Sequence, residues 1–173
     1  MMEAVGQRLR QEELTYQIYT MRKHQPNLLK EFRNHPGAVL LATGSAWEGM
    51  DFPGDMVSLL VIPKLPFPYP NELKEKQKGQ YSSLQDFINS VVLPEMQIKL
   101  RQGFGRAIRT ETDTCVVAVL DERCAPGKRY YADLLNALPD GIPETNESAD
   151  ITEFMLDKKH ARYFTEADDG HQK

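Results

Sequence analysis

Three short, uninterrupted apolar runs constrain the fold of this chain more than any other feature. They are AVLLAT at residues 38–43, VSLLVIP at 57–63 and TCVVAVLDER at 114–123, the last of which ends in polar residues. An apolar run of this length, bounded by turn formers or charged residues, is typical of a buried strand. Helical patterns separate the runs, so the sequence predicts an α/β fold with a mainly parallel sheet and helices on both faces.

The segments around these runs carry the helical patterns. Residues 2–20 are charged and amphipathic and predict a first helix, and NLLKEFRNHPG at 27–37 predicts a second. Residues 94–109, with a proline in the first turn, and residues 129–139 predict two more. KLPFPYPNE at 64–72 contains three prolines and therefore predicts a loop.

The character of the chain changes after Pro139. DGIPETNESAD is acidic and rich in helix breakers, which favours a linker, and ITEFMLDKKHARYF predicts one more helix over 151–164. We therefore expect one domain over residues 1–139 and an acidic linker and tail over 140–173.

The composition excludes several classes of protein. The 173 residues are 40% hydrophobic and 27% charged, which is typical of one soluble globular domain. No apolar run is long enough to cross a bilayer, and the two cysteines form neither a disulfide framework nor a metal-ligand spacing, so we expect a cytoplasmic protein without a metal site. The net charge is −4, so any contact with nucleic acid must come from a local basic patch.

The stretch QGFGRAIR at residues 102–109 indicates a site for an anion. On a helical wheel the side chains of Met96, Leu100, Phe104, Ala107 and Ile108 share one face, and those of Gln102, Arg106 and Arg109 share the opposite face. A guanidinium donates in a planar fork and stays charged, which suits the oxygens of a phosphate. Gly103 and Gly105 remove side chains beside this stripe, so a ligand can approach the backbone. The alternative is a solvated basic helix face.

The loop GSAWEGMDFPG at residues 44–54 follows the first predicted strand directly. Ligands of open α/β sheets bind at the carboxyl ends of strands, where this loop would lie. Asp51 is suited to accept hydrogen bonds from ribose hydroxyls, and Glu48 to accept backbone N–H groups of the loop. Thr43, Gly44 and Ser45 offer hydroxyl and N–H groups to a nucleic-acid phosphate. The alternative is an acidic turn with Trp47 packed on its flank.

Taken together and in this order, these segments resemble the second RecA-like motor domain of superfamily 2 DNA helicases of the DinG/XPD-like group. GSAWEGMDFPG is similar to motif V of that group, and QGFGRAIR to motif VI, of the form Q-x-x-G-R-x-x-R. LPFPYP and VLDER are similar to the sequences that the group carries between and after these motifs. The resemblance covers residues 28–139. It implies a RecA-like three-layer α/β/α sandwich, here lacking its first strand because a helix is expected at the start of the chain.

The resemblance also implies roles for particular residues. ATP and Mg²⁺ would be held mainly by another RecA-like lobe, and Arg106 and Arg109 would reach the γ-phosphate as arginine fingers, with Gln102 contacting the γ-phosphate or the attacking water. Glu48, Gly49, Asp51 and Gly105 would lie at the nucleotide. Single-stranded DNA would contact Thr43, Gly44, Ser45, Lys64, Phe67 and Tyr69, with the two aromatic rings stacking on bases. For Phe67 and Tyr69 the alternative is a hydrophobic anchor of the proline-rich loop.

The sequence departs from that of a whole helicase. It contains no G-x-x-x-x-G-K-[ST] and no DEAH-like run, so we expect no ATP hydrolysis by this chain alone and a partner lobe in cis or in trans. Two cysteines cannot hold the iron–sulphur cluster that members of the group often carry. A missing edge strand would favour self-association. Two alternatives stay open: a non-catalytic module that binds nucleic acid or protein, and an unrelated phosphate-binding protein that takes free nucleotide.

Overall fold

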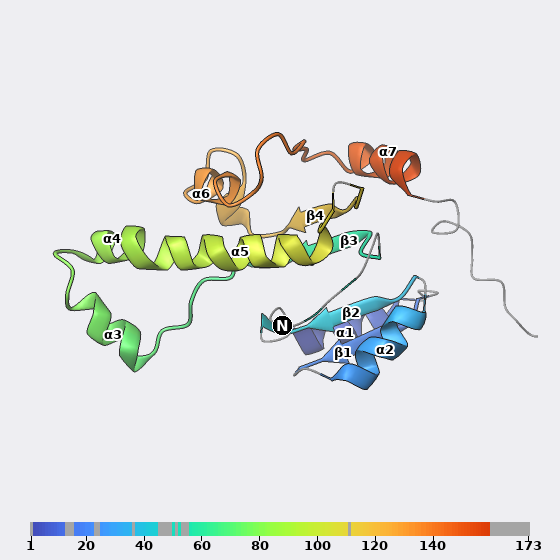
Figure 1. The fold of residues 1–173 in the computed structure, drawn as a ribbon, viewed down its shortest axis with the longest axis horizontal. Coiled ribbons are helices and arrows are strands. Elements are labelled where there is room, and N and C mark those ends of the chain that lie inside the picture. The colour runs from blue at the N-terminus through green and yellow to red at the C-terminus, as the bar shows by residue number, and fades with distance from the viewer. Residues whose placement is uncertain are drawn as a thin grey trace, which may run out of the picture.

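The computed structural model of the chain describes residues 2–12, 16–22, 25–35, 37–44, 50, 52, 56–110 and 112–159 (Figure 1). The strands are β1 (Ile18–Met21), β2 (Val39–Ala42), β3 (Leu59–Ile62) and β4 (Val116–Val119). The helices are α1 (Met2–Gln11), α2 (Pro26–Asn34), α3 (Glu72–Lys78), α4 (Leu84–Phe87), α5 (Leu93–Ala107), α6 (Tyr131–Leu135) and α7 (Ser148–Lys158). A π-helical turn at Ile88–Val92 joins α4 to α5, and a 3₁₀ turn at Glu122–Cys124 follows β4.

The strands form two parallel pairs. β1 pairs with β2, with Ile18 opposite Val39, and β3 pairs with β4, with Leu59 opposite Val116. The three apolar runs therefore form strands as predicted, and parallel pairing within an α/β chain is confirmed. Among the described residues the strands make two separate two-stranded sheets, so a single sheet in a three-layer RecA-like sandwich remains a prediction.

The prediction of one helix over residues 2–20 is wrong in its second half. The helix α1 ends at Gln11, and residues 18–21 form the strand β1. Isoleucine, tyrosine and threonine favour extended backbone, and the ladder to β2 gives their backbone groups partners that outweigh the weak helical periodicity. A strand therefore precedes α2, but the described chain still opens with the helix α1, so the absence of the first RecA-like strand remains a prediction. At Gly6, which is buried, an added Cβ would lie 3.0 Å from Leu41 Cδ1, so α1 packs closely on β2.

Two hydrophobic clusters correspond to the two sheets. In one, α2 covers β1, and the buried residues are Met21, Leu29, Met50 and Phe52. In the other, α5 lies along β3 and β4 in Figure 1, and the buried residues are Ile62, Leu65, Met96, Leu100, Cys124, Leu134 and Ala137. Met96 and Leu100 are fully buried, and Phe104 and Ala107 are nearly so, which confirms four of the five residues predicted for the packing face of the helix.

The remaining helices differ from the predictions mainly at their ends. α6 forms within residues 129–139 but spans only Tyr131–Leu135. The predicted C-terminal helix is α7, which begins at Ser148 rather than at 151 and ends at Lys158; residues 160–164 of that prediction lie outside the described residues. None of the helices in the described segments has both the length and the apolar character needed to cross a bilayer.

Candidate functional site

The predicted stripe of Gln102, Arg106 and Arg109 is divided by the end of α5. The helix stops at Ala107, and Ile108 is extended, with φ −129° and ψ 115°. Asp113 Oδ2 accepts hydrogen bonds from the backbone N–H groups of Arg109 and Thr110 at 2.9 and 3.0 Å, which turns the chain away from the helix axis. Gln102 is exposed on the helix and Arg109 is exposed beyond it, so the prediction that all three share one helical face is wrong for Arg109.

The carboxylate of Asp113 is stabilised in its charged form by this turn. The N–H of Arg109 contributes most to lowering the pKa of Asp113, followed by the backbone and side chain of Thr110. Asp113 therefore fixes where the backbone of Arg109 leaves the helix, and it does so as an anion.

Arg106 lines a small apolar cavity between the two hydrophobic clusters. The cavity has a volume of about 60 Å³, and its other lining residues are Met50, Phe52, Val57, Leu60, Gly103 and Ala107. Nε of Arg106 is buried there without a hydrogen-bond partner in the described part of the chain. A buried donor is almost always paired in folded proteins, so this nitrogen calls for an explanation.

This cavity brings the two sequence motifs together. Met50 and Phe52 belong to GSAWEGMDFPG, both are buried, and they lie beside Arg106 of QGFGRAIR. The residues predicted for the nucleotide in the first motif, Glu48, Gly49 and Asp51, lie outside the described residues, as does Ser45.

The two glycines of QGFGRAIR occupy different environments. Gly103 was predicted to lie beside the exposed stripe. It is instead buried on the packing face of α5, where it lines the cavity. Gly105 is exposed, and an added Cβ would meet no atom within 4 Å. Open space beside Gly105 is compatible with the approach of another molecule to this part of the helix.

At the end of β2, Thr43 and Gly44 are the described members of the predicted phosphate-binding group. The hydroxyl of Thr43 donates to the carbonyl of Arg22 at 2.9 Å, which connects the residues that directly follow β1 and β2. Gly44 is exposed, with open space around it.

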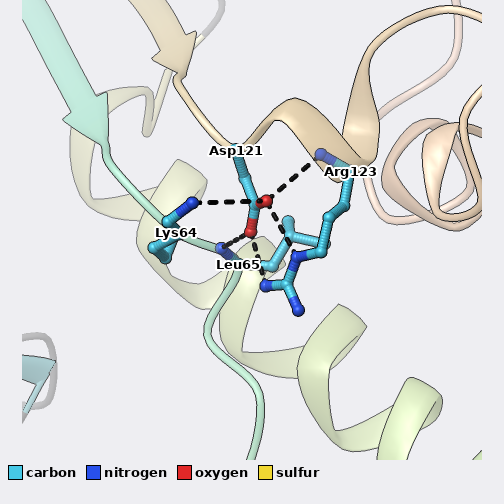
Figure 2. Close-up of polar contacts among 4 residues, drawn as sticks. All are labelled: Lys64, Leu65, Asp121 and Arg123. Atoms are coloured by element: carbon cyan, nitrogen blue, oxygen red, sulfur yellow. Dashed lines mark hydrogen bonds and ion pairs between the residues drawn. The ribbon is translucent and has the colours of Figure 1, made fainter.

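A second polar cluster lies where β3 and β4 end, and its centre is Asp121 (Figure 2). The Asp121 side chain is fully buried. Its carboxylate accepts from the N–H of Leu65 at 3.0 Å and from Arg123 Nε and Nη2 at 2.9 and 2.7 Å, and Lys64 Nζ lies 3.9 Å away. The Arg123 guanidinium is the main cause that holds the pKa of Asp121 far below its usual range, and Asp121 in turn raises the pKa of Arg123.

The carboxylate therefore joins two loops. Leu65 begins the proline-rich loop after β3, and Arg123 lies in the turn after β4, so Asp121 fixes each loop relative to the other. Cys124, next in the turn, is buried in the hydrophobic cluster, and burial raises the pKa of its thiol to about 11. At neutral pH this thiol is protonated and packs as an apolar group.

Aromatic rings and guanidinium groups surround this cluster. The rings of Phe67 and Tyr130 lie 5.1 Å apart, the Arg123 guanidinium lies 5.1 Å from the centre of the Phe67 ring, and the Arg129 guanidinium lies 5.2 Å from that of Tyr130. Phe67 is half-buried in this arrangement, as the anchor alternative predicts, whereas Tyr69 is 87% exposed and Lys64 is 55% exposed.

Sequence reasoning missed Asp121, Arg123, Arg129 and Tyr130 as a group. The available signal was the run DER directly after a buried strand, because a carboxylate at a strand end is well placed to accept from a neighbouring loop. The pairing with Leu65 is invisible in the sequence because 56 positions separate the two residues.

The two groups of candidate residues lie at opposite ends of the β3–β4 sheet. Asp113 precedes β4, and the Arg106 cavity includes Val57, which precedes β3. Lys64, Tyr69 and Arg123 follow the carboxyl ends of the same two strands. Among the described residues no group of three or more His, Cys, Asp and Glu side chains gathers in a way that could hold a metal ion.

Comparison with known proteins identifies relatives of the chain. The family described as helicase C-terminal domain matches residues 1–141. The ATP-dependent DNA helicase YoaA of Haemophilus influenzae is 38% identical over 133 residues, which are 76% of this chain and 20% of that protein. The ATP-dependent DNA helicase DinG of Photobacterium profundum is 36% identical over 69% of this chain and 17% of its own length.

A third relative carries a different name. The 3'-5' exonuclease DinG of Bacillus subtilis is 35% identical over 65% of this chain and 12% of its own length. The chain thus spans about a fifth or less of the length of the curated relatives it matches.

Proposed function

Because this chain belongs to the helicase C-terminal domain family, we propose that it is the C-terminal motor lobe of an ATP-dependent DNA helicase. The relatives named DNA helicases are similar to it over most of its length. The observation that carries the proposal is the cavity in which Arg106 meets Met50 and Phe52, because it joins the two motifs that nucleotide hydrolysis would require on this lobe.

In this proposal Arg106 and Arg109 are arginine fingers. Magnesium-bound ATP is the substrate, held mainly by a second RecA-like lobe, and the two guanidinium groups stabilise the negative charge that develops on the transferred phosphoryl group. Among the described residues the buried Nε of Arg106 has no hydrogen-bond partner, which supports this role because such a donor is suited to an acceptor that another molecule supplies. Gln102, exposed one turn before Arg106, would contact the γ-phosphate or the attacking water.

The loop 44–54 would couple the nucleotide to DNA. Glu48, Gly49 and Asp51 would approach the nucleotide, together with the open backbone at Gly105. Thr43, Gly44 and Ser45 would contact the phosphates of single-stranded DNA, and Lys64, Phe67 and Tyr69 would contact it at the end of β3. Closure of two lobes on ATP and reopening after hydrolysis would then move the lobe along the strand.

The alternative is a non-catalytic module that binds nucleic acid or protein. The exposed Tyr69 and Lys64 serve that function equally well, since neither depends on ATP. The two functions differ in whether Arg109 matters for turnover.

The deciding experiment measures ATP hydrolysis stimulated by single-stranded DNA, using the complete protein that carries this segment. Arg109→Ala is expected to lower kcat by about 10³-fold or more while most DNA binding is retained. Arg8→Ala is the matched control, because Arg8 is an exposed arginine on α1 and belongs to neither motif. Equal rates for wild type and Arg109→Ala, or a complete protein without any DNA-dependent hydrolysis, would rule out the finger assignment and favour the binding module.

A further inference from the structure

The turn after β4 carries a set of cations and rings that the proposed DNA contacts do not include. We propose that single-stranded DNA bound at the loop 64–69 continues across this turn, over a surface formed by Lys64, Phe67, Tyr69, Arg123, Lys128, Arg129 and Tyr130, here called the basic–aromatic surface. The inference rests on the proposed function and extends its DNA site to Arg123, Lys128 and Arg129.

Direct contacts connect five of these residues, Lys64, Phe67, Arg123, Arg129 and Tyr130, and Tyr69 and Lys128 are exposed neighbours in the same two segments. Lys64 and Arg123 meet on the carboxylate of Asp121, and the Arg123 guanidinium covers the ring of Phe67 and lies 5.8 Å from the centre of the Tyr130 ring. Arg129 stacks on Tyr130 and donates to Gln85 Oε1 on α4 at 3.3 Å, which extends the surface to the arm formed by α3 and α4.

Arg123 is held in position to donate outward. Nε and Nη2 are bound to Asp121, and Figure 2 shows the third nitrogen of the guanidinium with no interaction to the residues drawn. The side chain is 47% exposed. A guanidinium fixed on two nitrogens and stacked on a ring loses little further freedom when its last nitrogen binds a phosphate.

The charge of the surface is opposite to that of the chain. Within the two segments that form the surface, residues 64–69 and 121–130, the four cations Lys64, Arg123, Lys128 and Arg129 outnumber the carboxylates of Asp121 and Glu122, whereas the net charge of the chain is −4. No ion pair is formed by Lys128 or Arg129 among the described residues, which leaves their charge available to a polyanion. Gly127, with φ +76°, makes the turn that places Lys128 and Arg129 after the 3₁₀ turn.

The combination of cations with an exposed ring favours a single strand over a duplex. Tyr69 is 87% exposed and lies two residues from Phe67, whose ring packs on Tyr130, so its own ring is open beside an anchored part of the loop. Unpaired bases stack on such rings and phosphates follow a basic groove beside them, which is the usual mode of single-strand binding.

The test measures binding of a fluorescent oligothymidylate of about 20 nucleotides to the whole chain by anisotropy at several salt concentrations. Arg129→Gln and Arg123→Ala are each expected to weaken binding roughly threefold or more and to reduce the salt slope by about 0.7, the value for one phosphate contact on a single strand. Lys76→Gln on α3, an exposed lysine outside the surface, is the matched control and is expected to leave the slope unchanged. Arg129→Gln keeps the test valid if Arg123→Ala does not fold, because Arg129 lies outside the Asp121 network.

Each other outcome overturns the inference. Equal weakening by Arg129→Gln and Lys76→Gln would mean a diffuse charge effect. Binding that depends on Tyr69 and Lys64 and not on Arg123 or Arg129 would end the DNA path at the loop 64–69 and leave the proposed function intact. Absence of binding by the wild-type chain at low salt would also overturn it, whereas the proposed function would still be decided by ATP hydrolysis in the complete protein.

Discussion

At the carboxyl ends of β3 and β4 a buried carboxylate is hydrogen-bonded within the fold, whereas at their amino ends a buried guanidinium nitrogen has no partner among the described residues. Asp121 accepts from Leu65 and Arg123 and fixes two loops. Arg106 Nε lies beside a cavity of about 60 Å³ and donates to no partner in the part of the chain that the structure describes, although it is buried. The first region has polar groups that stabilise the fold, whereas under the proposed function the donor in the second region would be satisfied by a ligand supplied from outside.

The largest expected loss of stability is at the carboxyl ends of β3 and β4, where Asp121 joins two loops. Asp121→Ala removes the acceptor of Leu65 N–H and Arg123, so we expect a loss of about 3 kcal/mol in the free energy of unfolding. That loss corresponds to a fall in Tm of about 6–12 °C for a chain of this size. Urea unfolding measures it, with Asp140→Ala, an exposed aspartate, as the control that should stay within about 0.5 kcal/mol of wild type. A loss no larger than that of the control would mean that Asp121 does not hold the loops.

Replacing an arginine with methionine at each end of the β3–β4 sheet compares the two regions directly. Arg123→Met leaves Asp121 buried with fewer donors and should cost about 2 kcal/mol. Arg106→Met keeps the aliphatic packing on Met50 and Phe52 and removes a buried donor that has no partner among the described residues. It should therefore be neutral or stabilise the fold by up to about 1 kcal/mol. Urea unfolding of both variants measures the two changes in the free energy of unfolding. Similar losses for Arg123→Met and Arg106→Met would contradict the difference between the two regions.

How far the sequence alone could predict these features follows from the range of the interactions. The apolar runs and the packing face of α5, with Met96 and Leu100, depend on local periodicity and were predicted correctly. The helix over 2–20 was wrong because the pairing of Ile18 with Val39 across the chain decides that residues 18–21 are extended.

The candidate site was predicted in part, for the same reason. The motifs indicated Arg106, but the placement of Arg109 beyond the helix depends on Asp113, which lies outside the motif. The network of Asp121 with Leu65 and Arg123 required the parallel pairing of β3 with β4, which periodicity does not define.

A substitution of Asp113 tests whether Arg109 must be held in position at the amino end of β4. Asp113→Ala removes the acceptor for the N–H groups of Arg109 and Thr110, so it should lower Tm by less than Asp121→Ala does. If Arg109 is a finger as proposed, Asp113→Ala should lower kcat of the complete protein by about tenfold, less than removal of Arg109 itself, because the guanidinium is displaced and not lost. Asp113→Asn keeps an acceptor in the same place and should restore most of kcat, whereas an Asn variant as slow as the Ala variant would show that position of the acceptor is not what matters.

The smallest expected effect is the pH dependence of the stability that Asp121 contributes. Arg123 lowers the pKa of Asp121 in the folded chain below the value of about 3.9 that an unfolded aspartate has, so the folded state binds fewer protons. The stability that Asp121 contributes is therefore complete above about pH 4 to 5 and is lost as the pH falls toward the folded pKa. The gap in unfolding free energy between wild type and Asp121→Asn should stay constant from about pH 7 to pH 5 and narrow below about pH 4. Urea midpoints measured across that range test it. A gap that persists undiminished near pH 3 would mean that the shape of the side chain, and not its charge, joins the two loops.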